Sequence, residues 1–208
     1  VHPVPTPSKI VCVGRNYVAH AREMGNDVPK EPLLFLKPPS AIIREGESIV
    51  LHPVSTHIEF EGEIAVVIGA RLSKAGSEAE ARAAIGGVVA LNDVTARDLQ
   101  RNDGQWARAK GLDTFCPLGP VAPVPADLET IQLVTRVNGQ VVQEATGADM
   151  VFKIPFLLHY ISQYLTLEPG DLVATGTPAG TRKLEPGDVV EVELVGLSRV
   201  SNPVVAPS

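Results

Sequence analysis

Three acidic residues alternate along one short stretch of the chain and run into an apolar segment. Glu59, Glu61 and Glu63 occupy every second position, and the apolar residues 64–68 follow directly. Because successive side chains of a strand point to opposite faces, the three carboxylates share a face, and those nearest the apolar run are drawn partly out of water. Carboxylates crowded in a partly dry place repel one another unless a cation lies between them. The pattern therefore indicates a site for Mg²⁺ or Mn²⁺, which prefer oxygen ligands.

An edge strand with a solvated acidic face has the same alternation, so this pattern alone leaves both interpretations open. A third potential ligand comes from another part of the chain. Residues 88–91 are all apolar and predict a buried strand, which places Asn92 and Asp93 at its carboxyl end. Asp93 is thus a natural partner for Glu61 and Glu63 at a metal site.

A histidine and a glutamate form a second candidate group. The composition of residues 18–24 predicts a short helix stopped by Gly25-Asn26, and His20 and Glu23 lie three positions apart on it. A carboxylate that holds an imidazole fixes its tautomer and stabilises the imidazolium, which makes the histidine a plausible general base. A solvated surface pair is the alternative.

Several polar residues after Asp93 are candidates for holding an anionic substrate. Thr95 is expected to cap a short helix on which Arg97 and Gln100 share a face. Arg97 suits a substrate carboxylate, or equally a structural ion pair with Asp93 or Asp98. Lys110 would help to hold an anion near the acidic residues, or is a solvated loop charge. The loop 175–178 offers backbone amides and hydroxyls to a carboxylate.

Composition narrows the class of protein. The chain has 208 residues, 44% of them hydrophobic, which is enough for one domain, 1–208, with an extended arm over residues 1–8. It contains no apolar run of about 18 residues that would span a bilayer and no signal-peptide pattern, so a cytoplasmic location is expected. The net charge is −6 with dispersed basic residues, which argues against nucleic-acid binding. Cys12 and Cys116 are expected to be two buried thiols, with a structural disulfide between them as the alternative.

Strands outnumber helices in the predicted secondary structure. Asn138-Gly139 marks a hairpin, Ser77 with Glu80 marks a helix start, and Pro155 opens a helix that runs through Tyr164. Pro-Gly turns recur at short spacing, and neither the Rossmann nor the P-loop glycine fingerprint is present. These features predict a β-rich α+β domain with few helices.

Taken together, these motifs resemble the fumarylacetoacetate hydrolase family in its short single-domain form. The resemblance extends over nearly the whole chain and is carried by ordered motifs at 13–17 with His20 and Glu23, 35–38, 60–69, 92–100, Lys110 with 116–120, and 176–178. It implies a mixed β-sandwich roll of the family's C-terminal domain type, usually homodimeric. One departure is Gly111-Leu112, where the family commonly has Ser-Phe after the lysine.

The resemblance also implies roles for individual residues. Glu61, Glu63 and Asp93 match the family's ligands for Mg²⁺ or Mn²⁺, which leaves Glu59 as a neighbour. His20 and Glu23 match a dyad that activates water, and Lys110 matches a lysine at the substrate. The substrate-contacting positions of the family correspond to Arg15, Gln100 and Thr177.

The expected chemistry follows from a metal-bound 2-oxo acid, whose keto oxygen gains negative charge in the transition state. The first expectation is hydrolysis of a carbon–carbon bond in an acylpyruvate-type substrate, or oxaloacetate decarboxylation. The alternative enzyme is the 2-hydroxyhepta-2,4-diene-1,7-dioate isomerase (5-carboxymethyl-2-oxo-hex-3-ene-1,7-dioate decarboxylase) of aromatic catabolism. A non-catalytic, metal-stabilised ligand-binding domain is the third reading. The expected ligand is a small 2-oxo mono- or dicarboxylic acid.

Overall fold

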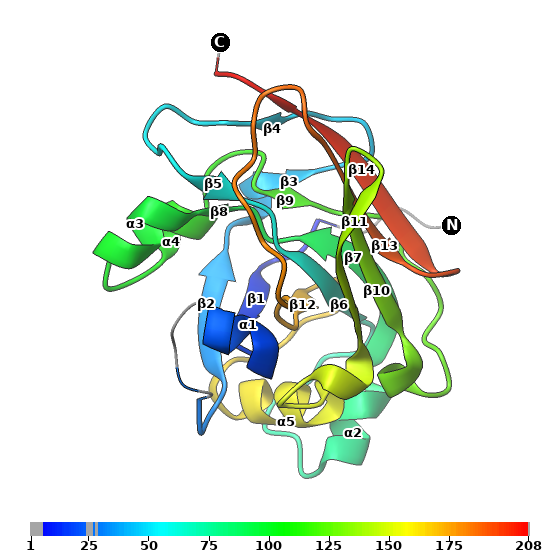
Figure 1. The fold of residues 1–208 in the computed structure, drawn as a ribbon. Helices are drawn as coiled ribbons and strands as arrows, with labels where there is room; N and C mark the ends of the chain where they lie inside the picture. The colour runs from blue at the N-terminus through cyan, green and yellow to red at the C-terminus, as the bar shows by residue number, and fades with distance from the viewer. Residues whose placement is uncertain (1–5, 24–26, 28, 208) are drawn as a thin grey trace.

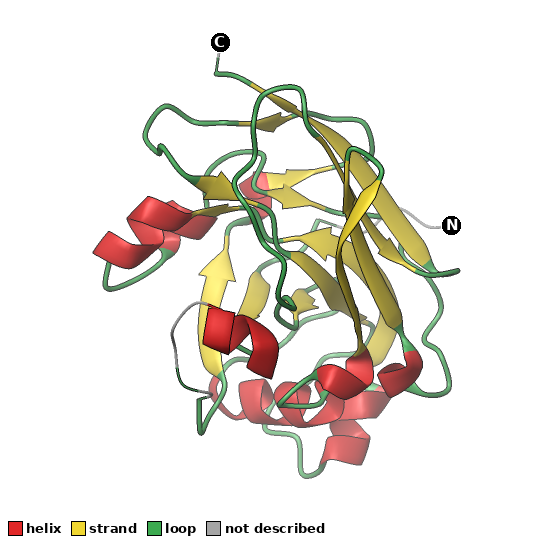
Figure 2. Ribbon diagram, in the orientation of Figure 1, coloured by secondary structure: helices red, strands yellow, loops and turns green. Residues whose placement is uncertain are grey.

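Two five-stranded sheets form the framework of the protein (Figures 1 and 2). The computed structural model describes residues 6–23, 27 and 29–207. The first sheet has the order β2-β1-β12-β6-β7. Its strands are β1 (Ile10–Gly14), β2 (Leu33–Lys37), β6 (Gly62–Ile68), β7 (Ile85–Asn92) and β12 (Leu172–Ala174). The second has the order β11-β10-β13-β14-β4. Its strands are β4 (Ile49–Val50), β10 (Gln132–Val137), β11 (Gln140–Thr146), β13 (Val189–Leu194) and β14 (Ser198–Val205).

Short strand pairs and helices complete the fold. Strands β3 (Ile42–Ile43) and β9 (Cys116–Pro117) pair, as do β5 (Ile58–Glu59) and β8 (Thr95–Ala96). The α-helices are α1 (Val18–Glu23), α2 (Glu78–Ala83), α3 (Arg97–Asn102), α4 (Ala107–Lys110) and α5 (Ile154–Tyr164). The 3₁₀ turns are η1 (Pro39–Ala41), η2 (Leu128–Thr130) and η3 (Gly147–Asp149). The predicted β-rich α+β class is confirmed.

Strand β6 is buried on both of its faces, which explains its continuous apolar sequence. Ile64 and Val66 belong to the largest hydrophobic cluster, to which β10, β13 and helix α5 also contribute side chains. Ala65 and Val67 point the other way, into a second cluster that contains both cysteines. The two thiols are buried and free, as predicted. A rigid, fully packed strand therefore carries the acidic stretch.

The local signals in the sequence produced the expected elements. Asn138 and Gly139 have φ values of 54° and 78°, the left-handed pair that a two-residue hairpin between β10 and β11 needs. The Ser77 hydroxyl accepts a hydrogen bond from the Glu80 amide (3.2 Å) and caps α2. Pro155 lies in the first turn of α5. The predicted stop at Gly25-Asn26 lies outside the described residues.

The predicted cap of helix α3 was wrong. The N-cap is Ala96, which has no side chain able to cap, whereas Thr95 lies in β8 and donates its hydroxyl to the carbonyl of Asp93 (2.8 Å). The Arg97 amide instead donates to the carbonyl of His57 (2.7 Å). Pairing with β5 therefore takes the place of the side-chain cap. Within the part of the chain that the structure describes, no helix is long and apolar enough to cross a membrane.

Candidate functional site

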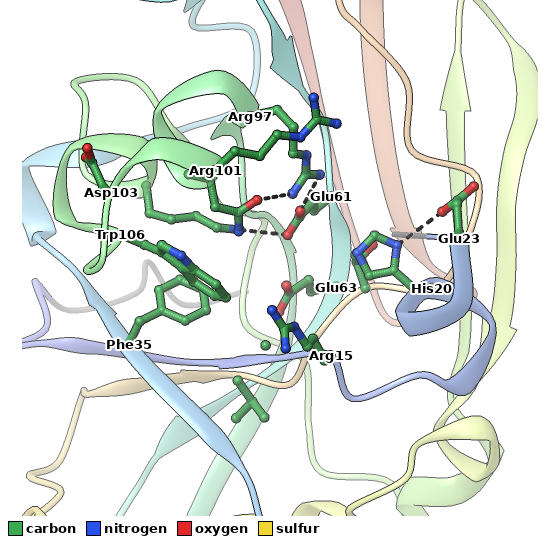
Figure 3. A pocket seen from close by; sticks show the side chains of 15 residues that line it. Arg15, His20, Glu23, Phe35, Glu61, Glu63, Arg97, Arg101, Asp103 and Trp106 are labelled. Carbon is green, nitrogen blue, oxygen red and sulfur yellow. Dashed lines mark hydrogen bonds and ion pairs between the residues drawn. The ribbon is translucent and has the colours of Figure 1, made fainter. Parts of the chain in front are cut away.

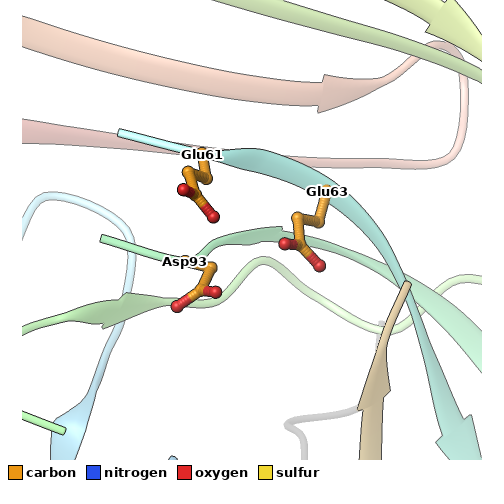
Figure 4. A group of neighbouring side chains, drawn as sticks. All are labelled: Glu61, Glu63 and Asp93. Atoms are coloured by element: carbon orange, nitrogen blue, oxygen red, sulfur yellow. The ribbon is translucent and has the colours of Figure 1, made fainter. Parts of the chain in front are cut away.

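Three carboxylates meet where β6 begins and β7 ends (Figure 4). Glu61, Glu63 and Asp93 are only 5%, 1% and 0% exposed, and one oxygen from each lies within 4.8 Å of the others. A solvated acidic strand face is therefore wrong for these residues. The carboxylates form a compact, buried set of hard oxygen donors, which is the chemistry that Mg²⁺ and Mn²⁺ select.

The strand pairing explains why the three groups converge. Strands β6 and β7 are antiparallel, with Gly62 opposite Asn92. Beyond this pair, the Asp93 amide donates to the carbonyl of Glu61 (2.8 Å), and the Glu61 amide donates to the Asn92 side chain (2.9 Å). Glu59 lies in β5 rather than β6, because residues 60–61 leave the strand. The acidic stretch is thus two short strands and not one continuous strand.

Two buried lysines neutralise much of this charge. The Lys110 ammonium bridges Glu61 Oε2 (2.8 Å) and Asp93 Oδ2 (2.6 Å). It also lies 4.9 Å from the centre of the Phe35 ring, a cation–π distance. The Lys37 ammonium lies 2.7 Å from Asp93 Oδ1 and donates to the carbonyls of Val94 and Lys110. Both lysines are 1% exposed, so Lys110 is not a solvated loop charge.

Arg97 pairs with different acids from those expected. Its guanidinium donates to Glu59 (2.6 and 2.9 Å) and to Glu61 Oε1 (2.7 Å), rather than to Asp93 or Asp98. The remaining nitrogen donates to the side-chain oxygen of Gln100 (2.6 Å). Arg97 is 1% exposed, with each of its guanidinium nitrogens engaged. It therefore orients Glu61 and Gln100 directly.

The protonation of the cluster is uneven. Burial opposes the ionisation of Glu61, but Lys110 and Arg97 outweigh it and lower its pKa. Burial raises the pKa of Glu63 well above its usual range, and the neighbouring charges of Asp93 and Glu61 raise it further. Burial also opposes the charge of Lys110, yet Asp93 and Glu61 keep its pKa raised. Lys110 and the Gly176 amide offset only part of this effect on the pKa of Glu63.

The loop after β12 completes the site around Glu63. The amide of Gly176 donates to Glu63 Oε2 (2.8 Å). Gly176 has a φ of 99°, which L-residues rarely adopt, and a Cβ there would come within 2.9 Å of Asn16. The Thr177 hydroxyl donates to the carbonyl of Gly62 (2.9 Å) and accepts from the side-chain NH₂ group of Gln143 (2.8 Å). These bonds hold the loop against the start of β6.

His20 and Glu23 form the predicted pair on helix α1. His20 Nδ1 lies 3.2 Å from Glu23 Oε2, and the Gly180 amide donates to both carboxylate oxygens of Glu23 (3.2 and 3.3 Å). His20 is 6% exposed, and its positive form lowers the pKa of Glu61. Figure 3 shows the imidazole between Glu23 and the carboxylates. The pair thus joins a buried histidine at the cavity to a glutamate that is itself exposed.

These groups line a single cavity of about 490 Å³ (Figure 3). Phe35 and Trp106 form an aromatic wall with ring centres 5.2 Å apart. Arg15 reaches the cavity from a left-handed turn after β1, with a φ of 59°. Asp93 does not line the cavity, whereas the other predicted site residues do: Arg15, His20, Glu23, Glu61, Glu63, Arg97, Gln100, Lys110 and Thr177.

Residues 9–205 match the model of the family described as fumarylacetoacetate (FAA) hydrolase C-terminal. The chain belongs to the fumarylacetoacetate hydrolase family. A relative with the name Oxaloacetate tautomerase FAHD2A, mitochondrial, from Homo sapiens is 43% identical over 215 residues, covering 98% of this chain and 68% of the human protein.

Two solved structures show the same family fold at substantial identity. The crystal structure of 2-hydroxyhepta-2,4-diene-1,7-dioate isomerase from Mycobacterium marinum has a TM-score of 0.89 and 42% identity, and the match covers 98% of this chain and 76% of that one. The crystal structure of fumarylpyruvate hydrolase from Pseudomonas aeruginosa, in complex with Mn²⁺ and pyruvate, has a TM-score of 0.90 and 30% identity. The match covers 99% of this chain and 91% of that one. The relatives' names thus include a tautomerase, an isomerase and a hydrolase.

Sequence reasoning missed two residues that shape this family site. Lys37 ends an apolar strand within the 35–38 motif, but the sequence predicts no role for it, although it contacts Asp93. Gln143 lies in a hairpin strand, yet its side chain accepts from the Gly62 amide (3.0 Å) and donates to Thr177. The available signal for Lys37 was a lysine placed between an apolar run and Pro38-Pro39. Gln143 had no local signal.

Proposed function

We propose that this protein is a Mg²⁺- or Mn²⁺-dependent enzyme that converts 2-oxo acids through an enolate. The observation that carries the proposal is the set of three buried carboxylates, two of which, Glu61 and Glu63, line one cavity with the His20–Glu23 pair. Glu61, Glu63 and Asp93 would hold the ion. When bound, the metal would supply positive charge to the keto oxygen on which negative charge develops. The manganese in the fumarylpyruvate hydrolase structure supports this assignment.

The charges of the site agree with a metal and an anionic substrate. Four buried carboxylates, those of Glu59, Glu61, Glu63 and Asp93, face three buried cations, those of Lys37, Arg97 and Lys110. The pKa of Glu63 is raised in the metal-free protein, so this group would ionise as it binds a dication, and the cluster would then carry an excess of one positive charge. Together with Arg15 and Arg101, which line the same cavity, the metal-loaded cluster would attract an anionic 2-oxo acid.

His20 is proposed to carry the proton. It would accept the proton that leaves the carbon next to the keto group and return it at the position that defines the product. Glu23 fixes the tautomer and stabilises the imidazolium, while the Gly180 amide holds Glu23 in place. Lys110 and Gln100 would contact the substrate from the other side of the cavity.

Two reactions share this proton transfer. Keto–enol conversion of an oxaloacetate-type acid needs only the base, and the names of the human and M. marinum relatives favour such a tautomerisation or isomerisation. Carbon–carbon hydrolysis, the first expectation from the sequence, also fits, since the His20–Glu23 pair can activate water. Oxaloacetate decarboxylation, named with it, would instead release CO₂ and have His20 protonate the enolate that remains. We propose the tautomerisation as the main activity, ahead of carbon–carbon cleavage.

The test follows the ultraviolet absorbance of enol-oxaloacetate and the cleavage of acetylpyruvate in parallel. Treatment with EDTA should abolish turnover and Mn²⁺ should restore it. His20→Gln should lower the rate of the active reaction by about 10²- to 10⁴-fold. His52→Gln, which changes a histidine outside the cavity, should not. Undiminished turnover by metal-free protein or by His20→Gln would contradict the proposal.

A further inference from the structure

Two arginines reach the cavity without an acidic partner of their own. Arg15 and Arg101 both line it, and neither makes an ion pair or hydrogen bond with the described residues. Arg97, in contrast, is fully engaged by Glu59, Glu61 and Gln100. The cavity therefore has two guanidinium groups available for a ligand.

The surroundings of Arg101 keep its charge available. Asp103, two residues further along, also lines the cavity, but it forms a bidentate pair with Arg108 (2.6 and 2.8 Å). This pairing neutralises the carboxylate that would otherwise compete for Arg101. Phe35 and Trp106 supply an apolar wall to the same cavity. Arg101 itself is exposed, so its guanidinium is accessible to a ligand that enters the cavity.

The two free arginines flank the acidic cluster. In the view of Figure 3, Arg101 and Arg15 lie on opposite sides of the carboxylates of Glu61 and Glu63. A ligand held at those carboxylates through a metal can thus present one anionic end to each arginine. Gln100 adds a donor on the side of Arg101, since its oxygen is taken by Arg97 and its NH₂ group makes no bond with the described residues.

We infer that Arg101 binds a second carboxylate, so that the substrate is a 2-oxo dicarboxylic acid and not a 2-oxo acid with a neutral tail. The inference rests on the proposed function and specifies the substrate class of the same site. Arg15 serves the carboxylate next to the keto group, and Arg101 serves the distal one. A guanidinium matches a carboxylate with two parallel hydrogen bonds, which gives both affinity and orientation. Arg101 thereby determines specificity without taking part in bond cleavage.

The experiment compares a diacid with its half-ester in the manganese-loaded enzyme. Oxaloacetate and its 4-ethyl ester differ only at the distal end, which is a charged carboxylate in the first and a neutral ethyl ester in the second. Arg101→Met should raise KM for oxaloacetate by about 10- to 100-fold, the loss expected for a charge-assisted pair, and leave KM for the ester and both kcat values nearly unchanged. Arg101→Lys should recover part of the affinity. Arg71→Met, at an exposed arginine paired with Glu168 outside the cavity, is the matched control.

Equilibrium binding separates failure of this inference from failure of the proposed function. Calorimetry measures oxalate, 2-oxoglutarate and 2-oxoglutarate 5-methyl ester on manganese-loaded protein. Arg101→Met should weaken 2-oxoglutarate alone, while unchanged oxalate binding shows that the variant is folded and loaded. If wild-type protein binds and converts acids and esters equally, or if Arg101→Met weakens all three ligands alike, Arg101 does not select a diacid. If no 2-oxo acid binds or reacts with wild-type protein, the proposed function itself fails.

Discussion

Replacing Lys110 by methionine removes the ammonium that bridges Glu61 and Asp93, at 2.8 and 2.6 Å, and keeps a side chain of similar length. In metal-free protein the two carboxylates then lose their closest shared cation in a site that is nearly sealed from solvent. Breaking a buried ion pair by deleting one partner typically costs about 3–5 kcal/mol. A domain of this size has about 5–15 kcal/mol of stability in total, so the loss is large.

The same substitution should be rescued by metal. A divalent ion held by the three carboxylates supplies the missing positive charge, and ligand at 100 times its Kd adds about 2.7 kcal/mol to the stability. Lys110→Met should therefore be strongly destabilised in EDTA and gain more from Mn²⁺ than wild-type protein does, because the ion need not displace an ammonium. The variant should also bind Mn²⁺ more tightly.

Urea denaturation of both proteins, with EDTA and with saturating Mn²⁺, measures this effect, provided that the m-value stays constant. Lys183→Met is the matched control, because its ion pair with Glu185 is exposed and should contribute less than about 1 kcal/mol. A metal-free Lys110→Met variant as stable as the control, or one that Mn²⁺ does not stabilise, would refute the view that this lysine and a metal compensate the same carboxylates.

Two further predictions concern pH. Since the pKa of Glu63 is raised in the metal-free protein, Mn²⁺ affinity should increase as the pH rises through that value, and Mn²⁺ binding should release protons. Calorimetry in two buffers of different ionisation enthalpy measures the released protons. A pH-independent affinity without proton release would contradict this prediction. Burial opposes the ionisation of Asp171, but hydrogen bonds from Lys9, Glu168 and Ser8 lower its pKa. Asp171→Asn should therefore lower the free energy of unfolding by about 1–3 kcal/mol at neutral pH. The difference in stability between variant and wild-type protein should disappear as the pH falls below about 4 and through the lowered pKa of Asp171. An equal loss of stability at all pH values would count against this prediction.

The parts of the site that the sequence predicted are those fixed by local rules. Alternation in a strand places Glu61 and Glu63 near each other, and a buried strand that ends in Asp93 supplies the third carboxylate. The three-residue spacing on a helix pairs His20 with Glu23. The spacing of Glu61 and Glu63 and of His20 and Glu23 needs only local geometry, whereas Asp93 joins the carboxylates because β6 pairs with β7.

The parts that were missed depend on which elements pack together. Lys37 ends β2, which lies against α4, and its ammonium contacts both the Lys110 carbonyl of that helix and Asp93 after β7. Arg97 pairs with Glu59 and Glu61, and not with Asp93 or Asp98, because the pairing of β5 with β8 brings Glu59 next to the start of α3. No spacing in the sequence encodes these long-range contacts. The single-domain boundaries, the homodimer, the cytoplasmic location and the roles of the site residues stay predictions.

The most direct test of the account is a crystal structure of the protein with Mn²⁺ and oxalate, with the ion located by its anomalous scattering. We predict one manganese ion ligated by Glu61, Glu63 and Asp93, with oxalate on its remaining positions and the Lys110 ammonium no longer between Glu61 and Asp93. An ion bound elsewhere, or these carboxylates still bridged by Lys110 at saturating Mn²⁺, would contradict the central claim.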